Sequence, residues 1–220
     1  MKIPSINSRN KYWDKRFERG AIYGENPSAI IKKMLKYLKG PKVLVAGGGY
    51  GRNSAFLADK GFNIVNFDIS KNALNLGKNV YKDRKNLKFL KGDITVANKL
   101  RNGFDSIICL YILSLLNDKE VEKAINNFKN ILVPNGKLIC NFLSNKDAEY
   151  GLGRQIGKNK FVLDNGEQFC KFYTKKEAVK LLKSLKFKII DIFEEKEKRF
   201  ISVLNKNIIS KSWVVICENR

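Results

Sequence analysis

The chain of 220 residues contains no histidine, and its four cysteines form no CxxC pair. The absence of histidine removes the side chain that most often acts as a general base or metal ligand near neutral pH. Three of the cysteines lie in apolar, strand-like runs, where a reduced, buried thiol is the usual state. We therefore expect a cytoplasmic protein without a metal site; the cysteines are Cys109, Cys140, Cys170 and Cys217.

Long hydrophobic runs are also missing. No apolar run approaches the ~20 residues that span a bilayer, and the N-terminal MKIPSINSRNKYWDKRF has no signal-peptide core. We expect no membrane association. Hydrophobic residues still make up 44% of the chain, enough for one sizeable core, so residues 1–220 are predicted to form a single domain.

Acidic residues are scarce, with 21 against 43 basic ones and a formal charge of +22. Such a charge is compatible with a nucleic-acid partner. Only nine of the basic residues are arginine, the better phosphate ligand, and the lysines are spread along helix-like segments. We interpret the charge as a solvated surface, so nucleic acid is possible but not favoured. The pattern predicts no particular oligomeric state.

Short apolar runs alternate with helical patterns, which predicts an α/β fold with a mostly parallel sheet covered on both faces. The last two strands are separated by 195–209, which has no helical pattern, so they are expected to form an antiparallel hairpin at one edge. Strands are predicted over 42–46, 62–67, 87–90, 104–113, 137–143, 186–194 and 210–218. Helices are predicted over 28–39, 52–60, 71–83, 118–132 and 174–185.

The segment VLVAGGGYGRNSAFLADKG, residues 43–61, places a glycine loop between a predicted strand and a predicted helix. Glycines there let the chain turn tightly and let a ligand contact the backbone. A dinucleotide fingerprint that starts at Gly47 needs a small residue at position 52, which is Arg52. The GxGxG pattern favours a ligand without a pyrophosphate, against the alternative of a tight turn with no ligand.

Two aspartates follow the next strands. Asp68 ends the second strand, nineteen residues after Gly49, where a carboxylate accepts both ribose hydroxyls. Asp93 follows the third strand and is placed to accept a hydrogen bond from an adenine amine. The alternatives are a helix cap and an ordinary loop residue. Ile69 and Ile94 are either the two sides of an adenine pocket or part of the core.

These motifs, with NFDIS, KGDI, FDSIICLYIL, LVPNGKLI and SWVVICE, resemble class I S-adenosylmethionine (SAM)-dependent methyltransferases over most of the chain. The closer resemblance is to small-molecule methyltransferases of the tellurite-resistance and thiopurine type, which share a leading segment like YWDKRFERGAIYGENPS and the GRNS after the glycine loop.

The resemblance implies a doubly wound, Rossmann-like sheet of seven strands in the order 3-2-1-4-5-7-6, with strand 7 antiparallel. It implies SAM as the cofactor and S-adenosylhomocysteine as the product. The implied cofactor residues are Gly47, Gly48, Gly49, Gly51, Arg52, Asn53, Asp68, Ile69, Asp93, Ile94 and Leu110. One position departs from the family: Val45 replaces the usual acidic residue, so backbone carbonyls near Gly47 and Leu110 are left to hold the methionine ammonium.

Methyl transfer from a sulfonium is an in-line displacement, which depends on holding the nucleophile close and aligned. A strong base is needed only when the nucleophile must first lose a proton, so a thiol, a chalcogenide or an amine suits a chain without histidine. Tyr111 and Ser114, after the fourth strand, are the candidate catalytic residues, because many relatives carry a histidine near this point.

Two segments are candidates for a lid on the substrate side. One is the aromatic N-terminal region, within residues 1–40, and the other is the insertion 144–173, whose length is typical of a functional connection. The alternatives are ordinary packing and solvated charge. The substrate-side candidates are Tyr12, Trp13, Arg16, Tyr23, Tyr150 and Arg154, with Phe17 and Lys171 beside them.

The sequence therefore predicts a SAM-dependent methyltransferase that acts on a small molecule. An RNA methyltransferase is the alternative that the charge suggests. A SAM-binding partner protein without catalysis is the alternative that Val45 and the missing histidine suggest. A nicotinamide dehydrogenase is disfavoured by Arg52.

Overall fold

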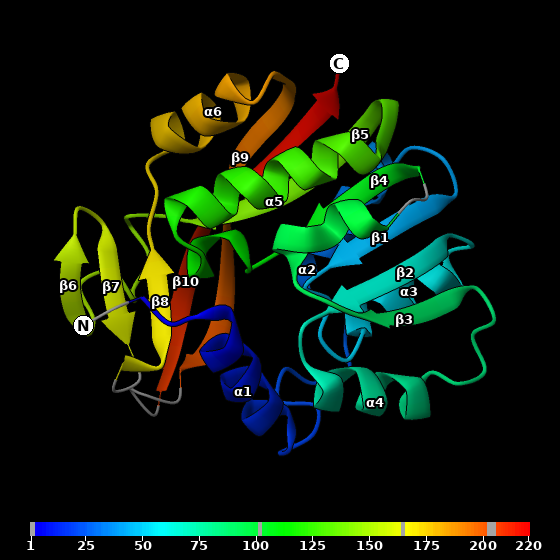
Figure 1. The fold of residues 1–220 in the computed structure, drawn as a ribbon, viewed down its shortest axis with the longest axis horizontal. Coiled ribbons are helices and arrows are strands. Elements are labelled where there is room, and N and C mark those ends of the chain that lie inside the picture. Colours follow the sequence, from blue (N-terminus) through cyan, green and yellow to red (C-terminus); the bar gives the residue numbers. More distant parts are fainter. Residues whose placement is uncertain (1–2, 101–102, 164–165, 202–205) are drawn as a thin grey trace.

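The computed structural model describes residues 3–100, 103–163, 166–201 and 206–220. A seven-stranded sheet runs through the molecule in the order β3-β2-β1-β4-β5-β10-β9 (Figure 1). The first five strands are parallel, and β10 is antiparallel to both neighbours. This is the predicted order, with β10 as strand 7 and β9 as strand 6. The strands are β1 (Lys42–Ala46), β2 (Asn63–Asp68), β3 (Leu87–Lys91), β4 (Phe104–Cys109), β5 (Leu132–Leu143), β9 (Phe187–Ile201) and β10 (Lys206–Asn219).

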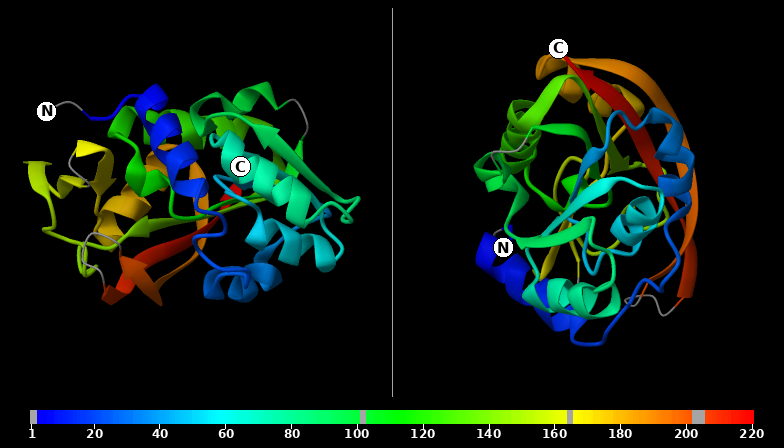
Figure 2. Two further views of the ribbon diagram at one scale, coloured as in Figure 1. Left: turned by 90° about the horizontal axis from the view of Figure 1, so that it is seen from below. Right: turned by 90° about the vertical axis from the view of Figure 1, so that its right-hand side faces the viewer.

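Helices cover both faces of this sheet, as Figure 2 shows from two sides. One face carries α2 and α3, whose apolar side chains pack on β1 and β4. The other carries η2, α5 and α6, which enclose the larger core. The helices are α1 (Ile6–Phe17), α2 (Ala29–Met34), η1 (Leu35–Tyr37), α3 (Arg52–Asp59), α4 (Lys71–Val80), η2 (Ile94–Lys99), η3 (Leu113–Leu115), α5 (Asp118–Ile131) and α6 (Lys175–Ser184).

Capping residues set several helix starts. Ser70 accepts from the backbone of Ala73 at the start of α4. A capping box of Thr174 and Glu177 opens α6. Two boundaries differ from the expectation. The helix predicted over 28–39 tightens into a 3₁₀ turn after Met34, and the strand predicted over 104–113 ends at Cys109, because the chain turns at Tyr111 with a φ of 63°.

The insertion 144–173 contains a second sheet, which the sequence analysis did not predict. Its strands are β6 (Arg154–Gly157), β7 (Lys160–Leu163) and β8 (Gln168–Lys171), all antiparallel. They enclose a small core of their own around Phe161 and Phe172. Lys160 and Lys171 both bond to Asp118, at 2.7 and 2.6 Å, so this sheet is tied to the start of α5.

The C-terminal hairpin is longer than predicted. The antiparallel pairing is confirmed, but the segment 195–209 is not a plain connection: β9 runs on to Ile201, and β10 begins at Lys206. Residues 194–198, EEKEK, are all charged, so a hydropathy pattern gives no signal for this part of the strand. Its alternation becomes clear in the structure, because Glu195 is buried and paired with Lys33 of α2 at 2.7 Å.

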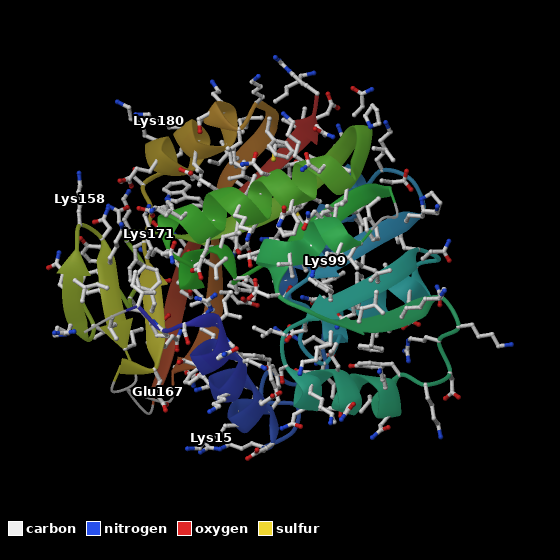
Figure 3. All side chains as sticks on the ribbon, in the orientation of Figure 1. Lys15, Lys99, Lys158, Glu167, Lys171 and Lys180 are labelled. Carbon is white, nitrogen blue, oxygen red and sulfur yellow. The ribbon has the colours of Figure 1, made fainter. Side chains whose placement is uncertain are left out.

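The four cysteines are buried and free of disulfide bonds. No helix in the described ranges is long and apolar enough to cross a membrane. The lysines labelled in Figure 3 belong to α1, η2, the β6–β7 turn, β8 and α6, so they are not confined to one element.

Candidate functional site

The glycine loop between β1 and α3 is pressed against β2. The backbone N–H of Gly47 donates to the carbonyl of Phe67 at 2.7 Å. Gly48 has no room for a side chain, because a Cβ there would lie 2.0 Å from Oδ1 of Asn66. Gly51 adopts a φ of 89° just before α3, which a side chain would strain. The loop needs its glycines for backbone packing and shape.

Asn66 holds this loop from below and was not predicted as a site residue. Its Nδ2 donates to the carbonyl of Gly49 at 2.9 Å, and its Oδ1 accepts from the hydroxyl of Ser54 at 2.6 Å. The asparagine is fully buried, so these bonds satisfy a side chain that would otherwise destabilise the fold. A polar residue inside the apolar run FNIVNF was the signal that could have identified it.

Asp68 holds the same loop from the end of β2. Its Oδ2 accepts from the N–H of Gly49 at 2.7 Å, and its Oδ1 from the N–H of Ser70 at 2.9 Å. Burial raises the pKa of this carboxyl group, while the hydrogen bonds from Ser70, Gly49 and Ile69 act in the opposite direction. Each carboxylate oxygen has a further lone pair, so both can still accept from ribose hydroxyls.

Asp93 lies one strand further along the same edge, after β3. Its Oδ1 accepts from the N–H of Thr95 at 2.7 Å, and its Oδ2 lies 3.9 Å from the guanidinium of Arg9. Arg9 comes from α1 and also bonds to both carboxylate oxygens of Glu120 on α5, at 2.9 and 3.2 Å. Arg9 was not predicted, because the segment around it is polar and carries no apolar pattern.

The apolar residues considered for the cofactor site are mostly part of the hydrophobic core. Ile94 is buried in the larger core, and Leu110 is buried in the core on the other face of the sheet, which carries α2. Ile69 is half-buried between Asp68 and the start of α4. Val45 is buried beneath the glycine loop, and its Cγ1 would lie 3.1 Å from a Cβ at Gly48. Among these residues, only Ile69 is partly open to solvent.

Arg52 and Asn53, predicted beside the cofactor, hold the N-terminal segment in place. The guanidinium of Arg52 donates to the carbonyls of Tyr23 and Asn26 at 2.7 and 3.0 Å. Oδ1 of Asn53 accepts from the N–H of Ser28 at 2.9 Å, where α2 begins. Their side chains therefore connect α3 to residues 23–28, and a direct contact with a cofactor stays a prediction.

Helix α1 lies across the carboxyl ends of the strands, next to α4 (Figure 1). Asp14 accepts from the hydroxyl of Ser70 at 2.7 Å and from the N–H of Asn72 at 3.2 Å, both at the start of α4. Phe17 packs edge-on against Tyr50 in the glycine loop, with ring centroids 5.9 Å apart. The N-terminal segment that was predicted as a lid is thus in contact with the glycine loop.

The substrate-side candidates of α1 form one cluster. Tyr12 packs edge-on against Trp13, and the guanidinium of Arg16 lies over both rings at 5.6 and 5.9 Å. The hydroxyl of Tyr12 donates to Gln168 of β8 at 2.9 Å, which joins α1 to the small sheet. Tyr23 is linked to this cluster through Phe17, whose ring centroid lies 6.3 Å from that of Tyr23 and 6.1 Å from that of Trp13, and it also lies beneath the guanidinium of Arg52.

Of the two candidates of the insertion, Arg154 lies in the small sheet and Tyr150 lies in the turn before it. The ring of Tyr150 packs edge-on against Phe161 and Phe172, and its hydroxyl bonds to Asn159 at 2.9 Å. Arg154 is exposed on β6, the edge strand. Lys171 pairs with Asp118. A substrate role for Tyr150 and Arg154 stays a prediction.

The two candidate catalytic residues occupy different environments. Ser114 is fully buried, and its Oγ accepts from the N–H of Leu143 at 2.8 Å, which supports the end of β5. Tyr111 is half-buried at the turn after β4; its N–H donates to Asn141 at 2.7 Å and its hydroxyl to Glu197 of β9 at 2.5 Å. Glu197 is 86 residues away in the chain, and no local signal indicated it.

Comparison with known proteins agrees with this arrangement. Residues 43–136, from β1 to the start of β5, match the family model for the methyltransferase domain. The probable SAM-dependent methyltransferase TehB of Haemophilus influenzae is 29% identical over 122 residues, 55% of this chain and 41% of that protein. A demethylmenaquinone methyltransferase of Renibacterium salmoninarum is 32% identical over 100 residues, 46% of this chain and 40% of that protein. The chain thus spans about two fifths of the length of these relatives.

Solved structures share the whole fold. The magnesium protoporphyrin IX methyltransferase of Synechocystis superposes with a TM-score of 0.71 at 18% identity, over 98% of this chain and 100% of that one. The fold is thus one that SAM-dependent methyltransferases share, and residues 43–136 resemble a methyltransferase domain. The chain also resembles TehB, whose structure from Haemophilus influenzae superposes with a TM-score of 0.67 at 17% identity, over 96% of this chain and 67% of that one.

Proposed function

We propose that this chain binds SAM at the carboxyl edge of β1–β4 and transfers its methyl group to a small molecule. The observation that carries the proposal is the pair of hydrogen bonds that fixes the glycine loop at Gly49. Asp68 fixes the N–H of Gly49 and Asn66 fixes its carbonyl, which leaves a bare, preformed backbone surface beside a buried carboxylate. Such a surface suits a ribose and a methionine chain without a phosphate group.

The parts of the cofactor follow from the order of the strands. Asp68, at the end of β2, is placed for the ribose hydroxyls, and Asp93, at the end of β3, for the adenine amine. The glycine loop and residues 110–112 are then left for the methionine end. These two segments are in contact, because a Cβ at Gly47 would lie 2.2 Å from Cγ1 of Ile112. With Val45 buried, backbone carbonyls are left to bind the ammonium group.

The acceptor is proposed to be a thiol, a chalcogenide or an amine. These nucleophiles react with a sulfonium methyl group once they are held in line with the breaking bond. The chain contains no histidine to deprotonate a weaker nucleophile. The relatives' names cover acceptors as different as demethylmenaquinone and phosphoethanolamine, so the acceptor must be found by experiment.

Calorimetry with SAM, S-adenosylhomocysteine and NADH tests the cofactor. We expect micromolar binding of the first two and none of NADH, followed by transfer of a labelled methyl group from SAM to members of a panel of thiols, chalcogenides and amines. Asp59→Ala is a matched control for Asp68→Ala, because Asp59 is exposed and pairs with Arg84. Failure of the wild-type chain to bind either compound would overturn the proposal.

A further inference from the structure

Arg9 places one positive charge between two carboxylates that belong to different parts of the fold. Its Nη2 atom donates to Oε1 of Glu120 at 2.9 Å and lies 3.9 Å from Oδ2 of Asp93. Asp93 follows β3, Glu120 lies in the first turn of α5, and Arg9 comes from α1. The side chains of Arg9, Asp93 and Glu120 are 8%, 13% and 19% exposed, so water and salt screen these charges only weakly.

Both carboxylates are also held by backbone groups. Oδ1 of Asp93 accepts from the N–H of Thr95 at 2.7 Å, and Oε2 of Glu120 accepts from the N–H of Asn117 at 3.0 Å, as part of the capping box that opens α5. Neither carboxylate forms another ion pair within the ranges that the structure describes. Because like charges repel strongly when they are partly buried, the guanidinium of Arg9 is what allows the two to lie this close.

Oδ2 of Asp93 is the oxygen left for the adenine amine under the proposed function, since Oδ1 already accepts from Thr95. At 3.9 Å the guanidinium of Arg9 attracts Oδ2 but does not donate a hydrogen bond to it. The lone pairs of Oδ2 can therefore accept from the amine while the charge of Arg9 holds the carboxylate. This charge comes from α1, which lies over the edge of the sheet (Figure 1), and not from the sheet itself.

We propose that Arg9 screens Asp93 from Glu120 and so keeps the carboxylate of Asp93 in place for the adenine amine, an inference that rests on the proposed function. Recognition of the base then depends on α1 being docked through Arg9. Without the guanidinium, Glu120 repels the carboxylate of Asp93 and drives it away from the amine. A ligand whose base has no amine gains nothing from the placement of Asp93. Arg9 acts through Asp93 and is therefore a positioning residue.

The test compares two ligands that differ only in the base: S-adenosylhomocysteine and its 6-deamino analogue, in which purine replaces adenine. Calorimetry on the wild-type chain should give a Kd about tenfold higher for the analogue, because a hydrogen bond to a carboxylate is lost. In Arg9→Gln the ratio of the two Kd values should fall to about threefold or less. Arg9→Lys keeps a positive charge and should preserve most of the ratio. If Arg9→Gln does not fold, the ratio is measured in sucrose, which favours the folded state.

A double variant separates screening from a structural role. Arg9→Gln combined with Glu120→Gln removes the cation together with the carboxylate that it screens, so Asp93 is no longer repelled. The ratio lost in Arg9→Gln should therefore largely return. Glutamine can still complete the capping box with Asn117, so the start of α5 is kept.

Asp14→Ala is the matched control for a general loosening of α1. Asp14 ties this helix to the start of α4 through Ser70 and Asn72, at 2.7 and 3.2 Å. Because Arg9 still binds Glu120 in this variant, the ratio of the two Kd values should keep its wild-type value, even where both Kd values rise.

Four outcomes would overturn the inference. They are a wild-type chain that binds S-adenosylhomocysteine no better than the 6-deamino analogue, an unchanged ratio in Arg9→Gln, a ratio that stays low in the double variant, and a ratio that falls as far in Asp14→Ala as in Arg9→Gln. Failure of the wild-type chain to bind S-adenosylhomocysteine at all is a different result, because it removes the proposed function itself.

Discussion

Arg9 and Glu120 join the N-terminal helix to the start of α5 through two hydrogen bonds of 2.9 and 3.2 Å. Their side chains are only 8% and 19% exposed, so the pair is shielded from solvent. Replacing Arg9 by alanine should lower the free energy of unfolding by about 1–3 kcal/mol, because a partly buried carboxylate loses its partner. Urea denaturation measures this loss.

Arg84→Ala is the control for that experiment. Arg84 pairs with Asp59 through two hydrogen bonds as well, at 2.8 and 2.9 Å, but the side chain of Asp59 is 53% exposed. An exposed pair contributes about 0.2–1 kcal/mol, so this variant should be the milder of the two. An equal loss of unfolding free energy in the two variants would mean that the Arg9–Glu120 pair stabilises the fold no more than the exposed Arg84–Asp59 pair does.

Gly48→Ala should disrupt the glycine loop. The new methyl group would lie 2.0 Å from Oδ1 of Asn66, which would push Asn66 away from Gly49 and deform the proposed cofactor surface. We expect the Kd for SAM to rise at least tenfold, about 1.4 kcal/mol, with some loss of thermal stability. Gly157→Ala is the control, since a Cβ there would make only ordinary contacts of 3.4 Å or more with Lys160. Unchanged affinity in Gly48→Ala would contradict the close packing.

Asp68→Ala should weaken SAM binding more than it weakens the fold. The substitution removes two hydrogen bonds from backbone N–H groups together with the proposed ribose contacts. It also removes a buried carboxyl group, whose pKa burial raises, and this offsets part of the lost stability. Calorimetry should show at least a tenfold rise in Kd, about 1.4 kcal/mol. An Asp68→Ala variant that binds SAM as well as Asp59→Ala does would exclude a ribose role.

Asp118 should make the attachment of the small sheet sensitive to acid. Partial burial raises the pKa of this carboxyl group, but the hydrogen bonds and charges of Lys160 and Lys171 outweigh it and lower the pKa below 3.8. The stabilisation is therefore fully present above pH 3.8 and is lost as the pH falls through the lowered value. At this half-buried position, where the carboxylate side chain is 47% exposed, it should amount to no more than about 1 kcal/mol.

Thermal unfolding of Asp118→Asn between pH 6 and pH 3 measures this contribution. The variant should be less stable than the wild type at pH 6, and the difference should shrink toward pH 3. A difference that stays constant over this range would show that the two lysines do not depend on the charge of Asp118.

The mostly parallel sheet and its antiparallel edge hairpin could be predicted because each element has a local signal: apolar runs such as residues 42–46 alternate with helical patterns. The order of the strands was implied by the resemblance to class I SAM-dependent methyltransferases and not by this alternation. The glycine loop and Asp68 were also predictable, since a strand followed by several glycines and then by an acidic residue at the end of the next strand defines their positions on the sheet. In the structure these segments meet through the hydrogen bond between Asp68 and Gly49; the ribose role of Asp68 stays a prediction.

The supporting contacts could not be predicted, because they join residues that are distant in the chain. Arg9 bonds to Glu120, 111 residues away, and Tyr111 bonds to Glu197, 86 residues away. Only the folded sheet brings these residues together. The hairpin strands were predicted too short because the charged residues 194–198 mask their alternation. The small sheet was missed because strands of four residues give almost no periodic signal.

Helix α1 contacts the proposed cofactor side and the small sheet through different side chains. Arg9 lies beside Asp93 and Asp14 bonds to Ser70 on the proposed cofactor side, while Tyr12 bonds to Gln168 of the small sheet. A single rigid helix cannot release one end and keep the other without tilting. Under the proposed function, exchange of the cofactor and exchange of the acceptor would both require this one helix to move, which predicts a compulsory order of binding and release.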